Sequence, residues 1–322
     1  MSFAPPVRWG ILGAANFALN HMGPAIHAAR GAELVAVASS AAEKVTPFQA
    51  FAPGIRHEES YEALLAATDI DAVYIPLPNH LHVEWAEKAL RAGKHVLCEK
   101  PLGMTSAEIE GLIRVRDDTG LVAAEAFMIV HHPQFQRARD LVADGAIGEL
   151  RFVNAEFSYD NPDSKNIRNK PETGGGGLRD IGVYTFGATR FVTGAEPERM
   201  THARKDLTNG VDTFSHNIFE FPGFTMSSMV STRMAPRQGM HFHGTEGVLS
   251  LTTPFNANVF GQAEVHLSRP DLTVMTERFP GVNHYVLQVE NFGAAIRGEA
   301  AYPWSLEQAQ GTQRMIEAAL EA

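Results

Sequence analysis

Three side chains that can move or stabilise a proton stand in two short segments of the chain. The segment GGGGLRDIGVY, residues 174–184, places Asp180 four residues before Tyr184. Residues four apart share one face of a helix, so we expect the carboxylate and the phenol to project together from a helix that the glycines introduce. The other segment, KHVLCEKP, places Lys100 directly after an apolar run and before Pro101. The proline biases the lysine away from helical geometry.

This set of side chains suits hydride transfer from a hydroxyl group. Oxidising a hydroxyl needs a base for the O–H proton while hydride leaves the carbon. A free tyrosine has a pKa of about 10, too high for a good base at neutral pH, but a nearby ammonium favours the phenolate and lowers that pKa by ~1–3 units. We therefore expect Tyr184 to act as the acid/base, Lys100 to tune its pKa, and Asp180 to orient Lys100 or hold a substrate hydroxyl.

The glycine run and the tyrosine each have a second interpretation. Glycine lets a backbone pass close to a flat ring or a sugar where a Cβ would clash. The alternative for the glycine run is a linker, and the alternative for Tyr184 is an aromatic side chain that packs against a sheet. Linkers seldom lead straight into a helix with a polar pair on one face, so we favour the site interpretation.

A segment near the start of the chain is similar to a nucleotide-binding loop. The segment WGILGAANFA, residues 9–18, ends an expected strand and opens an expected helix. Against G-x-G-x-x-G it has one glycine followed by two alanines, and a plain tight turn is the alternative. In a strand–turn–helix context such a loop exposes N–H groups that stabilise a pyrophosphate. The loop residues expected to bind the cofactor are Gly13, Ala15, Asn16 and Phe17.

The end of the second expected strand favours NADP over NAD. An NAD enzyme usually has Asp or Glu there to bind the ribose 2′-hydroxyl. This chain has Ser39 and Ser40 instead, with Lys44 one turn further on. Nothing at these positions would repel a 2′-phosphate.

The order of strand and helix patterns differs between the two parts of the chain. In the first part, apolar strand segments alternate with helical patterns, which predicts a parallel sheet covered on both faces, a doubly wound Rossmann domain over residues 1–128. In the second part, strands follow one another without helices between them. This predicts an α+β domain with an open-faced, mainly antiparallel sheet over residues 129–322. The expected strands of the first part are 7–12, 33–39, 71–77, 94–99 and 120–127, and its expected helices 16–29, 42–51, 61–66, 80–92 and 105–118. Those of the second part are strands 150–159, 211–221, 224–234, 238–244 and 263–268, and helices 178–192, 285–297 and 305–321.

Composition excludes several classes of protein. The net charge of −10 is spread along the chain without a basic block, which disfavours nucleic acid as a partner. No apolar run approaches the ~20 residues of a membrane span, and the first residues show no export signal. The single cysteine, Cys98, fits a reducing cytoplasm.

Histidine pairs are candidates for a metal site, and we expect no metal. His241 and His243 could share one face of a strand, and His131 is followed by His132. Neither pair has a third ligand at a recognisable spacing.

The motifs together resemble the glucose–fructose oxidoreductase / inositol dehydrogenase family over nearly the whole chain. The motifs are WGILGAANFA, VYIPLPNHLHVEW, HVLCEKPL, EAFM with HHPQ, and GGGGLRDIGVY. With Tyr in place of His, the last motif is most similar to NADP-dependent xylose and glucose dehydrogenases and dimeric dihydrodiol dehydrogenase. The resemblance implies catalysis by Lys100, Asp180 and Tyr184. It implies cofactor binding by Gly13, Ala15, Ser39, Ser40, Pro78, Asn79, His82, Glu99 and Lys100.

These observations predict a cytoplasmic, NADP-dependent oxidoreductase that acts on a sugar or polyol. The alternatives are a trans-dihydrodiol dehydrogenase or dicarbonyl reductase with the same site, and a non-catalytic NADP-binding regulator. We expect a homodimer or higher oligomer through the exposed face of the second domain's sheet. The segment FTMSSMVSTRM puts Met226, Val230 and Met234 on one face of that sheet.

Overall fold

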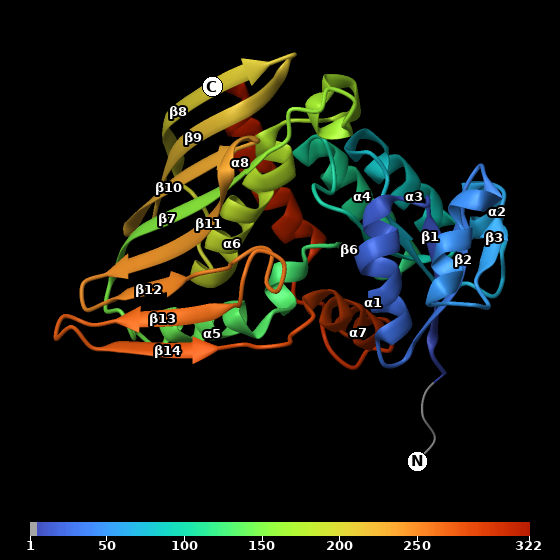
Figure 1. Cartoon of the computed structure of the whole chain (residues 1–322), viewed down its shortest axis with the longest axis horizontal. Coiled ribbons are helices and arrows are strands. Elements are labelled where there is room, and N and C mark those ends of the chain that lie inside the picture. Colours follow the sequence, from blue (N-terminus) through green and yellow to red (C-terminus); the bar gives the residue numbers. More distant parts are fainter. Residues whose placement is uncertain (1–4) are drawn as a thin grey trace. The chain divides into compact units, whose positions relative to one another are not determined.

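The computed structural model describes residues 5–322, and its contacts divide the chain into two compact units (Figure 1). The first unit comprises the chain up to His131 and also includes the later segment Asn283–Gln310. The second comprises His132–Val282 and Gly311–Ala322.

The first unit contains a six-stranded parallel sheet in the order β3-β2-β1-β4-β5-β6. Its strands are β1 (Val7–Leu12), β2 (Ala32–Ala38), β3 (Arg56–Glu58), β4 (Ala72–Ile75), β5 (His95–Cys98) and β6 (Ala123–Glu125). Central strands such as β4, AVYI, are buried at every residue, as both faces of the sheet are covered. The strand order reverses between β1 and β4, and ligands of such sheets bind beyond the carboxyl ends of the strands at that point. The Rossmann fold predicted from the alternating pattern is confirmed.

The helices of this unit follow the expected positions with one exception. Helix α4 begins at a capping box formed by Thr105 and Glu108 and ends at Gly120, whose φ is 67°. The helix expected over 42–51 is wrong: two 3₁₀ turns occupy the segment, because Pro47 removes a backbone donor and crowds the preceding turn. The helical elements are η1 (Ala18–Met22), α1 (Gly23–Ala28), η2 (Ala42–Lys44), η3 (Thr46–Ala50), α2 (Tyr61–Ala66), η4 (Asn79–Leu81), α3 (His82–Arg91), α4 (Ser106–Thr119), η5 (Met128–His131), α7 (His284–Ile296) and the start of α8 (Leu306–Glu321).

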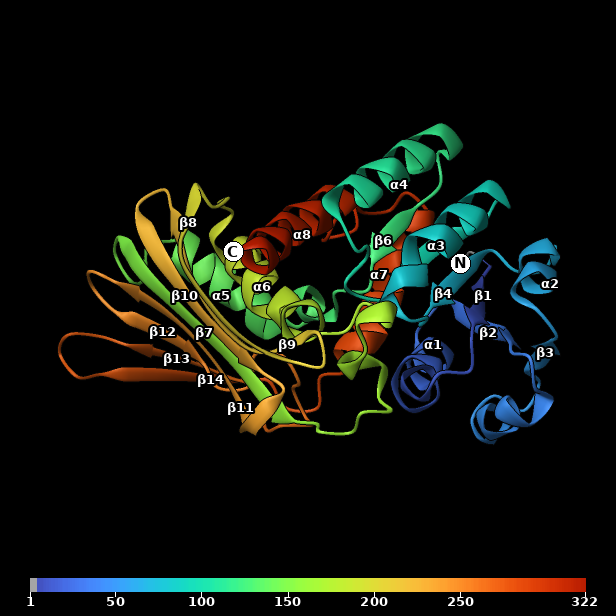
Figure 2. The ribbon, with the colours of Figure 1, turned by 90° about the horizontal axis from the view of Figure 1, so that it is seen from above.

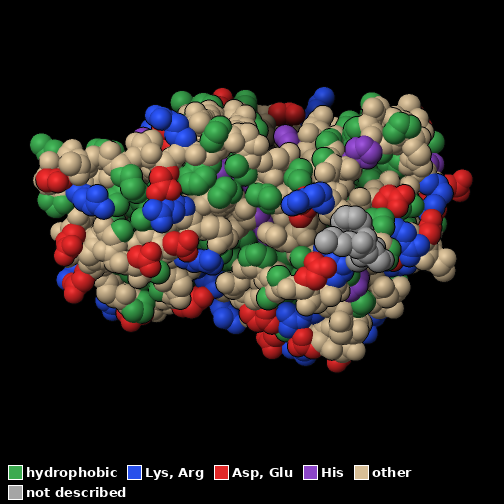
Figure 3. Space-filling model, turned by 90° about the horizontal axis from the view of Figure 1, so that it is seen from below, with side chains coloured by type: hydrophobic (Ala, Val, Ile, Leu, Met, Phe, Trp, Pro, Cys, Tyr) green, Lys and Arg blue, Asp and Glu red, His purple; other side chains and the backbone are tan. Residues whose placement is uncertain are grey.

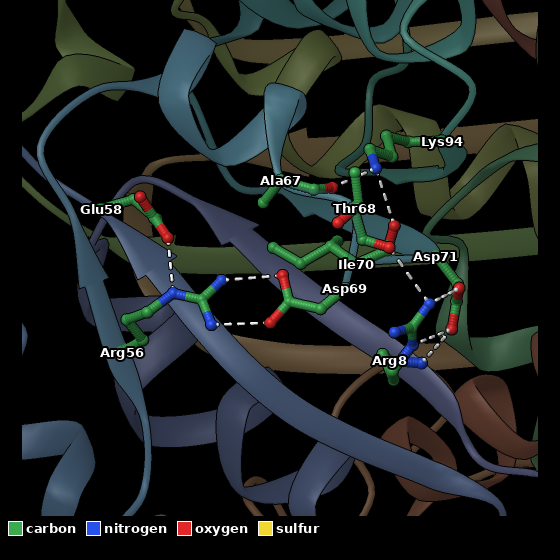
Figure 4. A network of polar contacts seen from close by, with 9 residues as sticks. All are labelled: Arg8, Arg56, Glu58, Ala67, Thr68, Asp69, Ile70, Asp71 and Lys94. Carbon is green, nitrogen blue, oxygen red and sulfur yellow. Dashed lines mark hydrogen bonds and ion pairs between the residues drawn. The ribbon is translucent and has the colours of Figure 1, made fainter.

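A polar network holds the amino ends of these strands (Figure 4). Arg8 at the start of β1 donates two bonds to the Asp71 carboxylate, at 2.6 and 2.9 Å. Lys94, which precedes β5, is 7% exposed and donates to the carbonyls of Ala67 and Ile70 at 2.6 and 2.8 Å. Desolvation lowers the pKa of Lys94. The network therefore fixes the edge of the sheet opposite the carboxyl ends.

The second unit contains an eight-stranded sheet in the order β14-β13-β12-β11-β7-β10-β9-β8. Neighbouring strands are antiparallel except β7 and β10, which are parallel. The segment expected as one strand over 224–234 is divided, because β10 ends at Ser231 and β11 begins at Arg233. The strands are β7 (Leu150–Asp160), β8 (Arg199–Thr208), β9 (Val211–Phe221), β10 (Phe224–Ser231), β11 (Arg233–Gly244), β12 (Val248–Leu251), β13 (Glu264–Ser268) and β14 (Val274–Arg278).

Helices cover one face of this sheet, as Figure 2 shows for α5 (Pro133–Ala143) and α6 (Val183–Thr193). Met226 and Val230 of β10 are 0% exposed and point to the helix side. Met226 and Val230 therefore lie on the covered face of the sheet, because α6 and the turn before it pack against β10. Met234 lies in β11, beyond the break, and is 42% exposed.

The open face of the sheet is mostly polar. His241 and His243 both lie on it, since the residue between them is buried, and His241 Nδ1 lies 2.9 Å from Ser250 Oγ. Phe152 of β7, 39% exposed, adds an apolar side chain to this face. On the part of the surface seen in Figure 3, Lys and Arg side chains are interspersed with Asp and Glu, without a broad patch of one sign.

Candidate functional site

The Gly13 loop lies at the carboxyl end of β1 and requires glycine. Gly13 has a φ of +108°, and a Cβ there would lie 3.1 Å from Leu77 Cδ2 and 3.3 Å from the Tyr61 hydroxyl. The loop closes through the Ala15 N–H, which donates to Gly13 O at 2.9 Å. Of the loop side chains predicted to bind the cofactor, Asn16 is exposed and Ala15 and Phe17 are half-buried. Part of this loop therefore lies at the surface, although Gly13 itself is buried.

The helix that follows this loop begins with a π-helical turn. In η1 the N–H of Gly23 donates to Ala18 O, five residues back. The N–H groups of a helix's first turn have no partner within the helix, so they remain available to an anion at the Gly13 loop. The residues present therefore fit a nicotinamide dinucleotide at this edge of the sheet.

The three residues predicted at the end of β2 differ in exposure. Ser39 is 6% exposed, its Oγ accepts from the Ala41 N–H at 3.4 Å, and its carbonyl lies 2.7 Å from His57 Nε2. Ser40 and Lys44 are exposed. Ser39 therefore shapes the turn, while the side chains of Ser40 and Lys44 remain at the surface.

The segment after β4 carries Pro78, Asn79 and His82. Pro78 and Asn79 are half-buried at the carboxyl edge. His82 is 0% exposed, with Nε2 2.7 Å from Leu77 O and Nδ1 2.8 Å from Pro101 O. Burial lowers the pKa of His82. The imidazole thus links the loop after β4 to the loop after β5, and we propose that it supports the cofactor site through these loops.

Glu99 and Lys100 follow β5 and are both half-buried. The Tyr74 hydroxyl of β4 donates to Glu99 Oε1 at 2.6 Å, and the Lys100 N–H donates to Glu99 Oε2 at 3.2 Å. Burial, with the Glu99 charge, raises the pKa of Tyr74, so that phenol remains a donor. Sequence reasoning missed Tyr74, because it reads as an ordinary core residue of a buried strand.

Asp180 of the second unit is held by two side chains that precede it in the chain. The Tyr159 hydroxyl donates to Asp180 Oδ2 at 2.5 Å, and Arg168 Nε donates to Asp180 Oδ1 at 3.0 Å. Burial and the Asp180 charge raise the pKa of Tyr159, so the phenol stays protonated. Sequence reasoning missed both partners, which lie in β7 and in the loop before the glycines.

Asp180 lies within a π-helical turn, η8 (Leu178–Gly182), and Tyr184 follows it in the first turn of α6. An α-helix was expected over this whole segment, so its first turn differs from the prediction. The Tyr184 ring is 5% exposed and packs against Phe157 and Phe255, with centroids 5.8 and 5.7 Å away. The ring packing expected of a core aromatic is therefore present, and the ring is held in one place.

The glycine run is explained by the protein's own atoms. A Cβ on Gly175 would lie 2.5 Å from Arg168 O, and a Cβ on Gly176, whose φ is +118°, would overlap Asp212 Oδ1. Asp212 is 3% exposed, and its Oδ2 accepts from the Leu178 N–H at 2.6 Å. The glycines thus let the chain approach a buried carboxylate that begins the turn carrying Asp180. The run is not a linker.

The described residues, 5–322, were predicted to hold no metal ion and no membrane span. No group of three or more His, Cys, Asp or Glu side chains in this range is arranged to hold a metal ion. Within the same range, no helix is both long enough and apolar enough to cross a membrane. His131 lies 3.0 Å from the Tyr302 hydroxyl, and His132 caps α5 by accepting from the Gln134 N–H, so each has a structural contact.

Comparison with known proteins gives consistent matches to both units. A family model described as an oxidoreductase family with an NAD-binding Rossmann fold, GFO_IDH_MocA, matches residues 7–127, and the GFO/IDH/MocA C-terminal domain matches 135–250. A dTDP-3,4-didehydro-2,6-dideoxy-α-D-glucose 3-reductase of Streptomyces violaceoruber is 38% identical over 90% of this chain and 85% of its own. D-xylose 1-dehydrogenase (NADP(+)) 2 of Haloferax volcanii is 33% identical over 98% of this chain and 97% of its own. The crystal structure of KijD10, a 3-ketoreductase from Actinomadura kijaniata in complex with NADP and TDP-benzene, has a TM-score of 0.90 at 32% identity, covering 98% of this chain and 97% of that one.

Proposed function

Because the chain belongs to the GFO/IDH/MocA family of oxidoreductases with an NAD-binding Rossmann fold, we propose that it transfers hydride between NADP(H) and a carbon of a sugar or polyol. A bound nicotinamide supplies the hydride acceptor in oxidation and the donor in reduction. The chain's own residues bind the dinucleotide, hold the substrate and move the proton.

We propose the following roles for the residues of the site. The Gly13 loop and the first turn of the next helix bind the pyrophosphate, and the Ser40 hydroxyl and Lys44 ammonium contact the 2′-phosphate. Lys100 stands at the carboxyl end of β5, on the same edge of the sheet as Gly13. Tyr184 takes or returns the proton of the reacting hydroxyl, and the Lys100 ammonium favours its phenolate.

Asp180 holds a substrate hydroxyl in this account. Both of its oxygens are already bound, one by the Tyr159 hydroxyl and one by Arg168 Nε. These two donors hold the carboxylate in one orientation, and we infer that a sugar hydroxyl donates to it. The observation that carries the proposal is this preorganised acid, followed one turn later by a tyrosine whose ring is fixed by packing.

The substrate defines two versions of the proposal. In the first, the protein oxidises the anomeric hydroxyl of a free aldose, as the name of the xylose dehydrogenase relative describes. In the second, it reduces a keto group on a nucleotide-linked sugar, which the higher identity to the dTDP-sugar reductase favours. The proton steps at Tyr184 are the same in both, run in opposite directions.

One assay distinguishes these versions. Absorbance at 340 nm follows NADP⁺ reduction with pentoses, hexoses, inositols and diols, and NADPH oxidation with keto sugars, free and dTDP-linked. We expect turnover on one sugar class. Turnover on diols alone would support a dihydrodiol dehydrogenase, and NADP binding without turnover on any compound would support a regulator.

We also propose a cytoplasmic homodimer formed through the open face of the eight-stranded sheet. Half-buried side chains such as Ile218 and Met229 lie on that face with Phe152, which is 39% exposed. An uncovered sheet face of this size is either solvated or covered by a partner.

A further inference from the structure

A buried carboxylate lies directly behind the segment that carries Lys100. Glu125, the last residue of β6, pairs in register with Cys98 of β5 and is 2% exposed. Its Oε1 accepts from the Leu102 N–H at 2.9 Å, and its Oε2 accepts from Trp304 Nε1 at 2.9 Å. Leu102 is two residues after Lys100.

The backbone after Lys100 is thus held from two sides. The Pro101 carbonyl lies 2.8 Å from His82 Nδ1, and the next N–H, that of Leu102, donates to Glu125. Both side chains that make these contacts are buried, so water does not compete for the backbone groups. Lys100 is therefore attached to a segment whose position depends on the Glu125 carboxylate.

The chemistry of this contact requires a carboxylate. An ionised carboxyl accepts on both oxygens, whereas a glutamine of the same length has one accepting oxygen and an NH₂ that only donates. At Glu125 a glutamine would turn its NH₂ toward either the Leu102 N–H or the Trp304 indole N–H. One buried donor would then lose its acceptor, which is costly in the protein interior.

Charge provides a second, independent link between Glu125 and Lys100. The pKa of Glu125 is raised to about 7, mainly by burial. The hydrogen bonds from Trp304 and Leu102 lower this pKa. The Glu99 charge raises it and the Lys100 charge lowers it. The other titratable groups near Glu125 are Cys98, whose pKa burial raises, and Tyr302, whose hydroxyl lies 3.5 Å from Glu125 O. With a pKa of about 7, the Glu125 carboxyl is about half ionised at neutral pH and becomes fully ionised only above it.

We propose that Glu125 is a positioning residue that holds Lys100 for proton transfer, through the Leu102 N–H on one side and the Trp304 indole on the other. The inference rests on the proposed function, in which Lys100 favours the phenolate of the acid/base. It also assigns a role to residues 283–310, which come late in the chain but belong to the first unit. This segment supplies Trp304, whose indole N–H donates to Glu125.

Three variants test the proposal: Glu125→Gln, Trp304→Phe and the double variant. Glu125→Gln should lower kcat by ~10–100-fold, the loss expected from a small misplacement of a catalytic group, with the KM for NADP within about twofold of the parent. In the parent, kcat should fall as the pH drops through about 7, and Glu125→Gln should lack this acidic limb of the pH profile. Trp304→Phe should keep most of the activity and move that limb to higher pH, because it removes a hydrogen bond that lowers the Glu125 pKa.

The double variant separates charge from packing. It removes the indole N–H that would clash with the glutamine NH₂, so the segment regains a compatible hydrogen-bond pattern without the charge. Because the proposal holds Lys100 through the Leu102 N–H, it predicts that the double variant recovers toward the rate of Trp304→Phe. A double variant as slow as Glu125→Gln would contradict positioning through that hydrogen bond.

A measurement without turnover makes the outcome independent of the proposed function. The rate of amine labelling at Lys100, read by mass spectrometry, is compared with that of exposed Lys44 in the same sample. Glu125→Gln should change the Lys100-to-Lys44 ratio severalfold. A ratio within twofold of the parent would overturn the positioning role, whereas a parent protein without turnover on any sugar would overturn only the proposed function.

Discussion

Replacing Gly176 by alanine should destabilise the second unit far more than an ordinary glycine substitution. Gly176 has a φ of +118°, and holding alanine in such a region costs about 1–3 kcal/mol. Its Cβ would overlap Asp212 Oδ1 and displace the carboxylate from the Leu178 N–H, now at 2.6 Å. Losing a hydrogen bond to a charged group costs about 1.5–3 kcal/mol. The expected loss of unfolding free energy is therefore ~3–6 kcal/mol.

Gly194 provides the matched control in the same unit. It ends α6 with a φ of +66°, and a Cβ there would meet nothing within 4 Å. Gly194→Ala should thus cost only the backbone strain, ~1–2 kcal/mol, and leave turnover unchanged. Gly176→Ala should also lower kcat, because it shifts the turn that carries Asp180.

The assay is urea denaturation of both variants, with NADP affinity measured by fluorescence. NADP affinity should be close to the parent value in both, since the Gly13 loop belongs to the first unit. If Gly176→Ala loses no more stability than Gly194→Ala, the close approach to Asp212 does not explain the glycine run.

Two further predictions concern the cofactor and the oligomer. Ser40→Arg should raise the affinity for NADP by ~10–100-fold and leave the affinity for NAD unchanged, because an exposed guanidinium can bind the 2′-phosphate with two hydrogen bonds. Titrations that give equal affinities for the two cofactors would reject the NADP assignment. Light scattering should give a dimer mass at micromolar concentration, and Phe152→Glu, on the open face of the sheet, should shift it toward the monomer; a parent protein of monomer mass would rule out that interface.

Much of the fold could be predicted because the signals are local. Helix α2 (Tyr61–Ala66) and strand β9 (Val211–Phe221) have the predicted bounds, since Ser60 caps the helix and a turn at Pro222-Gly223 ends the strand. Strand β3, only three residues long, was missed, because so short a segment carries no period.

Contacts between distant segments could not be predicted. Asp212 follows Gly176 by 36 positions, and its sequence context, an acid in a strand, gives no sign that its carboxylate starts another element. Glu125 and Trp304 are 179 residues apart, and their hydrogen bond depends on the return of the chain to the first unit.

The replacement of Tyr184 by phenylalanine tests the central claim most directly. The variant keeps the ring that packs against Phe157 and Phe255 and removes only the hydroxyl. On the best substrate found at 340 nm, we expect a loss of turnover of ~10²–10⁴-fold, the range of one general acid/base group, with melting temperature and NADP affinity as in the parent. Near-parental turnover would contradict the account and leave Tyr184 as a packing residue.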